Sequence, residues 1–167
     1  MKGLHDDLMR LLERELEGFK REIALFPDDE LMWRTMPGVT NSAANLGLHV
    51  AGGLRYLVGS VLGHTGYVRN REVEFGRRTG SRAEVTAELD RALAVVREVI
   101  PRLTETDLAR EYPEPVLGVT FGTRIFLLHL CAHAALHLGQ AGYLRRALTG
   151  DPTSSGPLPL APLTARG

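Results

Sequence analysis

The 167-residue chain is poor in cysteine, lysine and aromatic side chains. Its one cysteine, Cys131, excludes an intrachain disulfide and a cysteine-rich zinc module, and it fits a reducing compartment. Lysine and arginine together number 20 and balance 20 acidic residues, so the formal net charge is zero. No global field therefore favours nucleic acid, and we expect no nucleic-acid partner.

Long apolar runs are also missing from the sequence. No uninterrupted stretch reaches the ~18 apolar residues that span a bilayer, so we expect no membrane partner. The N-terminal stretch is charged and amphipathic, and it lacks the apolar centre of a signal peptide. We therefore expect a cytoplasmic protein. A hydrophobic content of 44% and a charged content of 24% are ordinary for a globular domain of this size.

Four segments show the apolar spacing of amphipathic helices. The expected helices cover about residues 2–26, 42–62, 82–100 and 121–148. Ser81 and Glu84 form a capping box at the start of the third helix, and Gly150 stops the fourth. Four such helices predict an all-α protein with the architecture of a four-helix bundle, occupying residues 1–150.

The connections between these helices are long. Residues 63–80 are glycine-punctuated and charged. Arg69, Arg71, Glu72 and Glu74 can shape a substrate entrance there, but a solvated charged loop is the favoured interpretation. Residues 101–120 are rich in proline and threonine, with a turn of helix expected near 106–110. The stretch VLGVTF has strand-like composition but no partner strand elsewhere in the chain.

Residues 151–167 form a proline-rich tail that we expect to be loosely ordered. Within the second expected helix, Gly52 and Gly53 stand side by side. Each glycine costs a helix roughly 1 kcal/mol relative to alanine. The pair therefore indicates either a close approach by another backbone or room left for another group.

The strongest chemical signal lies between Phe121 and Leu148, where His129, His133 and His137 are spaced four residues apart. Side chains at this spacing share one face of a helix. The rest of that face is mostly apolar and should face a core: Phe126, Leu130, Leu136, Gln140 and Leu144. Buried imidazoles need polar partners, and a metal ion is one such partner.

His133 and His137, joined by His49 from the second helix, can form an open three-histidine metal site. Core histidines that hydrogen-bond to neighbours are the competing interpretation, and the spacing also allows the pair of His129 and His133. Position 134 is alanine, so the zinc-protease motif is absent and brings no general base. No carboxylate can be named as the base from the sequence.

Several other residues are candidates for a supporting role. Gln140 lies one turn beyond His137, where it can orient a ligand or simply serve as a polar core residue. For Asn45, a hydrogen bond from helix to loop is favoured over a contact with the site. Tyr56 can line a pocket or belong to the core. Cys131 lies roughly 160° from His133 on the helix and is expected to be neither ligand nor nucleophile.

Two stretches, NSAANLGLHVAGGLRYLVGSVLG and HAALHLGQAGYLRRAL, resemble the DinB/YfiT-like family of metalloenzymes. The resemblance covers about residues 2–148. It implies an up-down-down-up bundle, usually dimeric, with a divalent ion (nickel, zinc or iron) on His49, His133 and His137. His129 matches no family ligand and falls to a supporting role. Family members of known activity are bacillithiol S-transferases and mycothiol-dependent isomerases.

The resulting functional hypothesis is a metal-dependent enzyme that activates water or a low-molecular-weight thiol for transfer or hydrolysis of a small-molecule substrate. The thiol rests on the resemblance, as does the expected homodimer. The alternative is a non-catalytic dimeric module that binds metal structurally or acts in a stress response.

Overall fold

The computed structural model describes residues 3–164. Within them the chain is helical and has no named strand, which confirms the all-α prediction. The long helices are α1 (Leu4–Ala24), α2 (Ala43–Leu54), α4 (Arg82–Val99) and α6 (Thr123–Thr149). The short ones are α3 (Arg71–Gly76) and α5 (Glu105–Ala109). The expected helix start at residue 2 and the tail residues 165–167 lie outside the described part.

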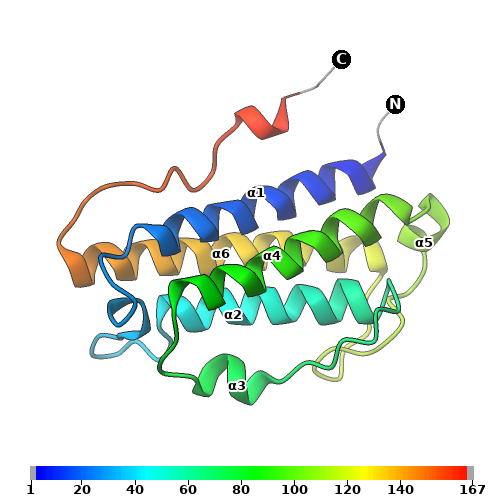
Figure 1. Ribbon diagram of the computed structural model, residues 1–167. Coiled ribbons are helices and arrows are strands. Elements are labelled where there is room, and N and C mark those ends of the chain that lie inside the picture. The colour runs from blue at the N-terminus through cyan, green and yellow to red at the C-terminus, as the bar shows by residue number, and fades with distance from the viewer. Residues whose placement is uncertain (1–2, 165–167) are drawn as a thin grey trace.

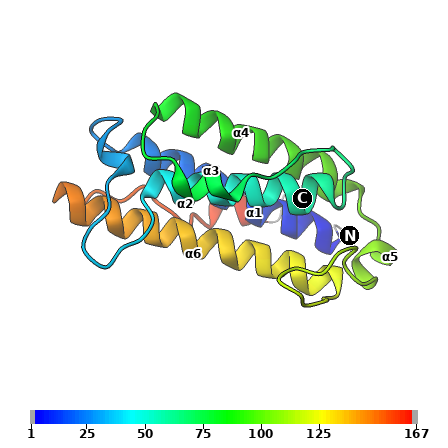
Figure 2. The ribbon, with the colours of Figure 1, turned by 90° about the horizontal axis from the view of Figure 1, so that it is seen from below.

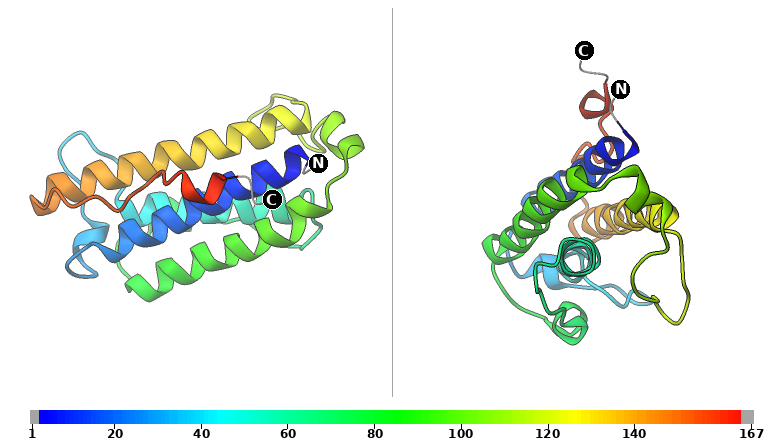
Figure 3. Two further views of the ribbon diagram at one scale, coloured as in Figure 1. Left: turned by 90° about the horizontal axis from the view of Figure 1, so that it is seen from above. Right: turned by 90° about the vertical axis from the view of Figure 1, so that its right-hand side faces the viewer.

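The four long helices form the bundle. α1 packs against α4 and α6, and α2 packs against the same two helices. In Figure 1, α1 and α6 run in one direction while α2 and α4 run in the other. Because α2 and α4 are parallel, the chain must return along the bundle between them. The connection that makes this return carries α3 on the outside of α2 (Figure 2 and the end view in Figure 3).

Local signals place the helix ends. The Ser42 side chain accepts from the Asn45 backbone N–H, and Ser81 does the same with Glu84, so both helices begin in capping boxes. Gly150 ends α6 in the left-handed conformation, with φ 68°. The core between the helices is aliphatic, and its largest fully buried apolar residues include Leu8, Leu12, Leu16, Phe19, Ile23, Leu89 and Ile100.

The second helix changes its hydrogen-bond pattern after Leu54. Residues Arg55–Ser60 form a π-helix, in which the Val61 N–H donates to the Tyr56 carbonyl five residues earlier. The helix expected over residues 42–62 is therefore regular only in its first half. Such π segments often occur near functional sites, and this one follows the helix that carries His49.

The segment 110–123 folds back on itself as a hairpin-like loop, which we call the hairpin loop. Isolated bridges join Glu111 to Gly122 and Val116 to Val119. The stretch VLGVTF therefore finds its partner within its own loop. At the tip, Leu117 and Gly118 have φ 53° and 78°, as a two-residue turn requires. The connection thus has an ordered tip.

Residues 151–164 run back along α1 (Figures 1 and 3). The fully buried Arg145 donates to the Glu22 carboxylate and to the backbone carbonyls of Asp151 and Thr153. Arg21 donates to the Ser155 carbonyl at 3.0 Å. These contacts connect the tail to both α1 and α6.

By length and composition, α6 could cross a membrane, in contrast to the expectation from the sequence. Less than half of the apolar stretch is buried in the protein. The central helix of a bundle meets the same criteria, and α6 packs against both α1 and α2.

Candidate metal centre

His49 of α2 meets His133 and His137 of α6 in the groove between the two helices. The Nε2 atom of His133 lies 3.2 Å from that of His49 and 3.1 Å from that of His137. One ring nitrogen from each histidine falls within 4.8 Å of the others. His49 is buried, while His133 and His137 are half-buried and border the surface. The structure thus brings the three predicted ligands together.

These distances suit a shared ion better than a set of hydrogen bonds. A ring nitrogen carries either one proton or one lone pair. His133 Nε2 therefore cannot form proper hydrogen bonds to His49 and His137 at once. Donor atoms bound to one ion at 2.0–2.1 Å stand about 2.9–3.4 Å apart for angles of 90–110°. The two separations that involve His133 fall in that range, and the ring nitrogens of His49 and His137 lie within 4.8 Å of each other.

His133 and His137 are in the protonation state that a metal needs. Burial lowers the pKa of His133 to about 3, with the neighbouring His137 and His49 adding to the effect. Burial also lowers the pKa of His137, against an opposing hydrogen bond in which the Gln140 side-chain oxygen accepts from its ring. Both rings are therefore neutral at pH 7 and have a lone pair available.

Glu74 sets the orientation of His49. Its Oε2 atom lies 3.1 Å from His49 Nδ1, and Arg69 donates to Oε1 and Oε2, each at 2.7 Å. Burial alone would raise the pKa of Glu74, but the hydrogen bonds from His49 and Arg69 prevail and lower it. The ionised carboxylate can only accept.

Arg69 Nη2 also lies 3.0 Å from His49 Nδ1, and arginine can only donate. Nδ1 cannot both donate to Glu74 and accept from Arg69. We assign the proton to Nδ1, because an ionised buried carboxylate needs every donor it can reach and Arg69 already has Glu74 as acceptor. This tautomer leaves the Nε2 lone pair of His49 facing the centre, as in carboxylate–histidine–metal arrangements.

The glycine pair of α2 provides the room for this contact. A Cβ atom on Gly52 would lie 2.2 Å from Glu74 Oε1, and one on Gly53 would lie 3.4 Å from Arg69 Nη2. Asn45, in the first turn of α2, holds the same segment in place, because its side-chain amide donates to the carbonyls of Glu74 and Arg77. The helix-to-loop hydrogen bond expected for Asn45 is thus present.

The remaining predicted residues take different places. Gln140 Oε1 lies 2.7 Å from His137 Nδ1, so Gln140 orients that ring. His129 is exposed, with its ring 6.0 Å from that of His133, outside the donor cluster. Tyr56 lines the outer part of the cavity beside the centre, where it donates to Glu114 at 3.1 Å. Cys131 is buried against α1, and burial raises the pKa of its thiol to about 12.

Two expectations from the sequence are wrong at this site. The charged segment is not wholly solvated, because Glu74 is only 5% exposed and Arg69 is paired with it. Arg71 and Glu72 are exposed, as expected. The histidine face of α6 does not wholly face a core either, since Leu136 is 57% exposed. That face instead forms one wall of an open groove.

A cavity of about 260 Å³ adjoins the centre, between α2, α6 and the hairpin loop. His49, His129 and His133 line it, together with apolar side chains of the helices. It continues outward into a space of about 430 Å³, and five residues line both parts. The shared residues are Leu57, Arg69, Arg71, Val116 and Leu117. The centre is therefore reachable from the surface.

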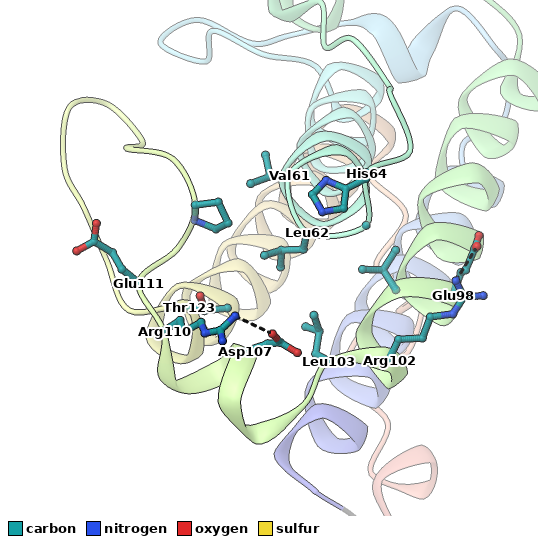
Figure 4. A pocket seen from close by; sticks show the side chains of 13 residues that line it. Val61, Leu62, His64, Glu98, Arg102, Leu103, Asp107, Arg110, Glu111 and Thr123 are labelled. Atoms are coloured by element: carbon teal, nitrogen blue, oxygen red, sulfur yellow. Dashed lines mark ion pairs between the residues drawn. The ribbon is translucent and has the colours of Figure 1, made fainter.

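A separate cavity of about 420 Å³ lies at the end of the bundle, near α5. Figure 4 shows two ion pairs at its rim, Arg102 with Glu98 at 3.4 Å and Arg110 with Asp107 at 3.9 Å. His64 is its one lining histidine. Because these charged side chains are paired with each other, they are less available to a ligand than the ring nitrogens of the histidine centre.

Comparisons with known proteins agree with this architecture. A conserved protein of Enterococcus faecalis has a solved structure with a TM-score of 0.73 to this one, at 18% identity. The match covers 90% of this chain and 100% of the other, and it shows the fold. No curated protein matches the sequence. The family model described as the DinB superfamily matches residues 11–141, most of the chain. The chain belongs to the DinB superfamily.

Proposed function

We propose that His49, His133 and His137 hold a divalent metal ion in an open three-histidine site of an enzyme that acts on a small molecule. The supporting observation is the position of His133 Nε2, close to two further ring nitrogens that it cannot satisfy by hydrogen bonding. Three imidazole ligands suit nickel, zinc or iron. Three protein ligands leave positions for a substrate or water.

Such an ion supplies Lewis acidity and lowers the pKa of a bound water or thiol. The protein's own residues orient the ligands: Glu74 holds His49, and Gln140 holds His137. Both oxygens of Glu74 are already engaged by Arg69, so this carboxylate is not free to act as a base. A nucleophile that ionises readily on its own, such as a low-molecular-weight thiol, therefore fits the centre well.

Metal analysis of the purified protein tests the site. We expect about one ion per chain in the wild type and a large loss in His49→Ala and His133→Ala. His129→Ala is the matched control, since its ring lies on the same helix but outside the donor cluster. Wild-type protein that contains no metal after growth in supplemented medium would refute the proposal.

A non-catalytic dimeric module is the second candidate. Its supporting observation is an exposed apolar stripe of α6 at the edge of the histidine face, where Ile125, Leu136 and Tyr143 are 60%, 57% and 75% exposed. Exposed apolar side chains on one helix face are typical of interaction surfaces. Metal-loaded protein that turns over no thiol with any electrophile, while forming a stable dimer in sedimentation experiments, would favour this candidate.

A further inference from the structure

The cavity beside the histidine centre has one wall that the proposed chemistry does not use. Val116 and Leu117, at the tip of the hairpin loop, form part of this wall. Leu117 is 94% exposed and lies in the left-handed region, with φ 53°. The left-handed conformation of a leucine is unfavourable, and in the ligand-free protein no burial of the side chain offsets this free-energy cost. An apolar group bound in the cavity would remove this side chain from water.

The cavity also contains a positive charge that has no ion-pair partner. Arg71, the first residue of α3, lines both the inner and the outer part. Its guanidinium lies 5.5 Å from the ring centre of Phe75. Among residues 3–164 it has no ion-pair partner within 4 Å. Arg71 can therefore bind an anionic group that arrives with a ligand.

Two other charged residues line the cavity, Arg69 and Glu114. Arg69 is paired with Glu74, so this pair presents little net charge. Glu114 lies only in the outer part, where it accepts a hydrogen bond from Tyr56. One available cation and one nearby carboxylate favour a ligand with a single negative charge over one with several.

We propose that this cavity binds an amphipathic monoanion, with its apolar body against Leu117 and Val116 and its carboxylate-type group on Arg71. The reactive end of the ligand then points to the histidine centre, so the inference rests on the function proposed above. Arg71 is a specificity-determining residue in this arrangement, and Leu117 provides the apolar contact. The substrate class is a small organic acid with an aliphatic segment.

Thiol probes on cobalt-substituted protein test the inference, because thiolate binding to cobalt gives a charge-transfer absorption. The probes are mercaptohexanoic acid, its primary amide and aminohexanethiol, with the corresponding mercaptopropionic series to vary the reach. In at least one of the two series, we expect the acid to bind about tenfold more tightly than the amide and the amine to bind most weakly. Arg71→Leu should abolish this order, while Arg71→Lys should keep part of it.

Arg102→Leu is the matched control, since Arg102 is an exposed arginine of the distant cavity. It should leave the order of the probes unchanged. Equal binding of acid, amide and amine by the wild type would overturn the inference but leave the metal site in place. An absence of charge-transfer absorption with every thiol would instead contradict the proposed thiol chemistry.

Discussion

His49 is the most constrained of the three histidines. Its ring is fixed by Glu74, whose carboxylate is in turn held by Arg69. Loss of such a carboxylate partner typically lowers metal affinity by about 10- to 100-fold. The geometry of the centre therefore depends on residues outside the donor cluster, including Gly52, which makes room for Glu74.

Gly52→Ala should weaken metal binding without unfolding the protein. Its new methyl group would overlap Glu74 Oε1, so the carboxylate must move away from His49. We expect about a 10-fold or larger loss of affinity, measured by competition with a chelator. Gly53→Ala is the matched control, because its methyl group makes only ordinary contact with Arg69. It should keep the affinity and gain up to roughly 1 kcal/mol of stability.

Equal loss of affinity in both alanine variants would contradict this account. It would indicate that the helix itself, rather than the position of Glu74, responds to the substitution.

Glu15 should make the stability of the protein depend on pH. This residue is 1% exposed, and burial raises the pKa of its carboxyl, although Arg14 opposes the shift. Because the folded-state pKa is raised, the contribution is most favourable below the ordinary pKa of 4.5 and is lost as pH rises through the folded value. Glu15→Gln should therefore become more stable relative to the wild type as the pH rises above 4.5.

Urea unfolding at several pH values measures this difference. Glu30→Gln is the control, since Glu30 is 80% exposed. A difference between Glu15→Gln and the wild type that does not change with pH would rule out the buried carboxyl as its cause.

At the scale of residues, the sequence predicts the histidines but not their partners. The spacing of His133 and His137 is visible because a helix repeats its faces regularly. Glu74 lies in a charged, glycine-rich segment without periodicity. In such a segment, the sequence does not distinguish a buried carboxylate from a solvated one. The one available signal was the glycine pair, which indicated room for another group without naming it.

At the scale of elements, the long helices follow from apolar spacing and capping residues, whereas the short pieces do not. α3 has six residues, too few for a periodic pattern. The π-helix after Leu54 shows no sequence signal that separates it from the α-helix before it. The hairpin loop pairs with itself, so a search for a distant partner strand misses it.

Leu117→Asn should stabilise the hairpin loop. Asparagine tolerates the left-handed conformation, and Asn-Gly is a favoured pair in two-residue turns. Because Leu117 is 94% exposed, little packing is lost. We expect a gain of about 1 kcal/mol in the unfolding of metal-free protein. The same variant should bind the apolar thiol probes more weakly, so that stability and affinity change in opposite directions.

Gly118→Ala is the companion variant for this turn. It places a side chain at a second left-handed position and should lower stability. A loss of stability in Leu117→Asn as well would show that the leucine makes favourable contacts even without a ligand.

At the scale of the whole molecule, the tail completes the burial of Arg145. A chain ending at Gly150 would lose the carbonyls of Asp151 and Thr153, which accept from this fully buried guanidinium. Unpaired buried donors cost about 1–3 kcal/mol each, so we expect a loss of roughly 2 kcal/mol or more in urea unfolding. Metal content should not change.

A chain ending at Gly156 is the matched control, because it keeps both carbonyl acceptors. In the shorter chain, the paired substitution Glu22→Leu with Arg145→Met should recover part of the loss, since a buried ion pair can be replaced by apolar side chains. Equal stability of the two truncated chains would contradict this role of the tail.

His49 and His133 are 84 residues apart in sequence, and they come together only when the bundle has formed. An ion bound by both would act as a reversible cross-link between two halves of the chain. By the entropy of closing a loop of this length, such a link restricts the unfolded chain by about 4–5 kcal/mol, comparable to a long-range disulfide. A protein whose only cysteine is buried could thus obtain from a metal the kind of covalent-like restraint that secreted proteins obtain from oxidation.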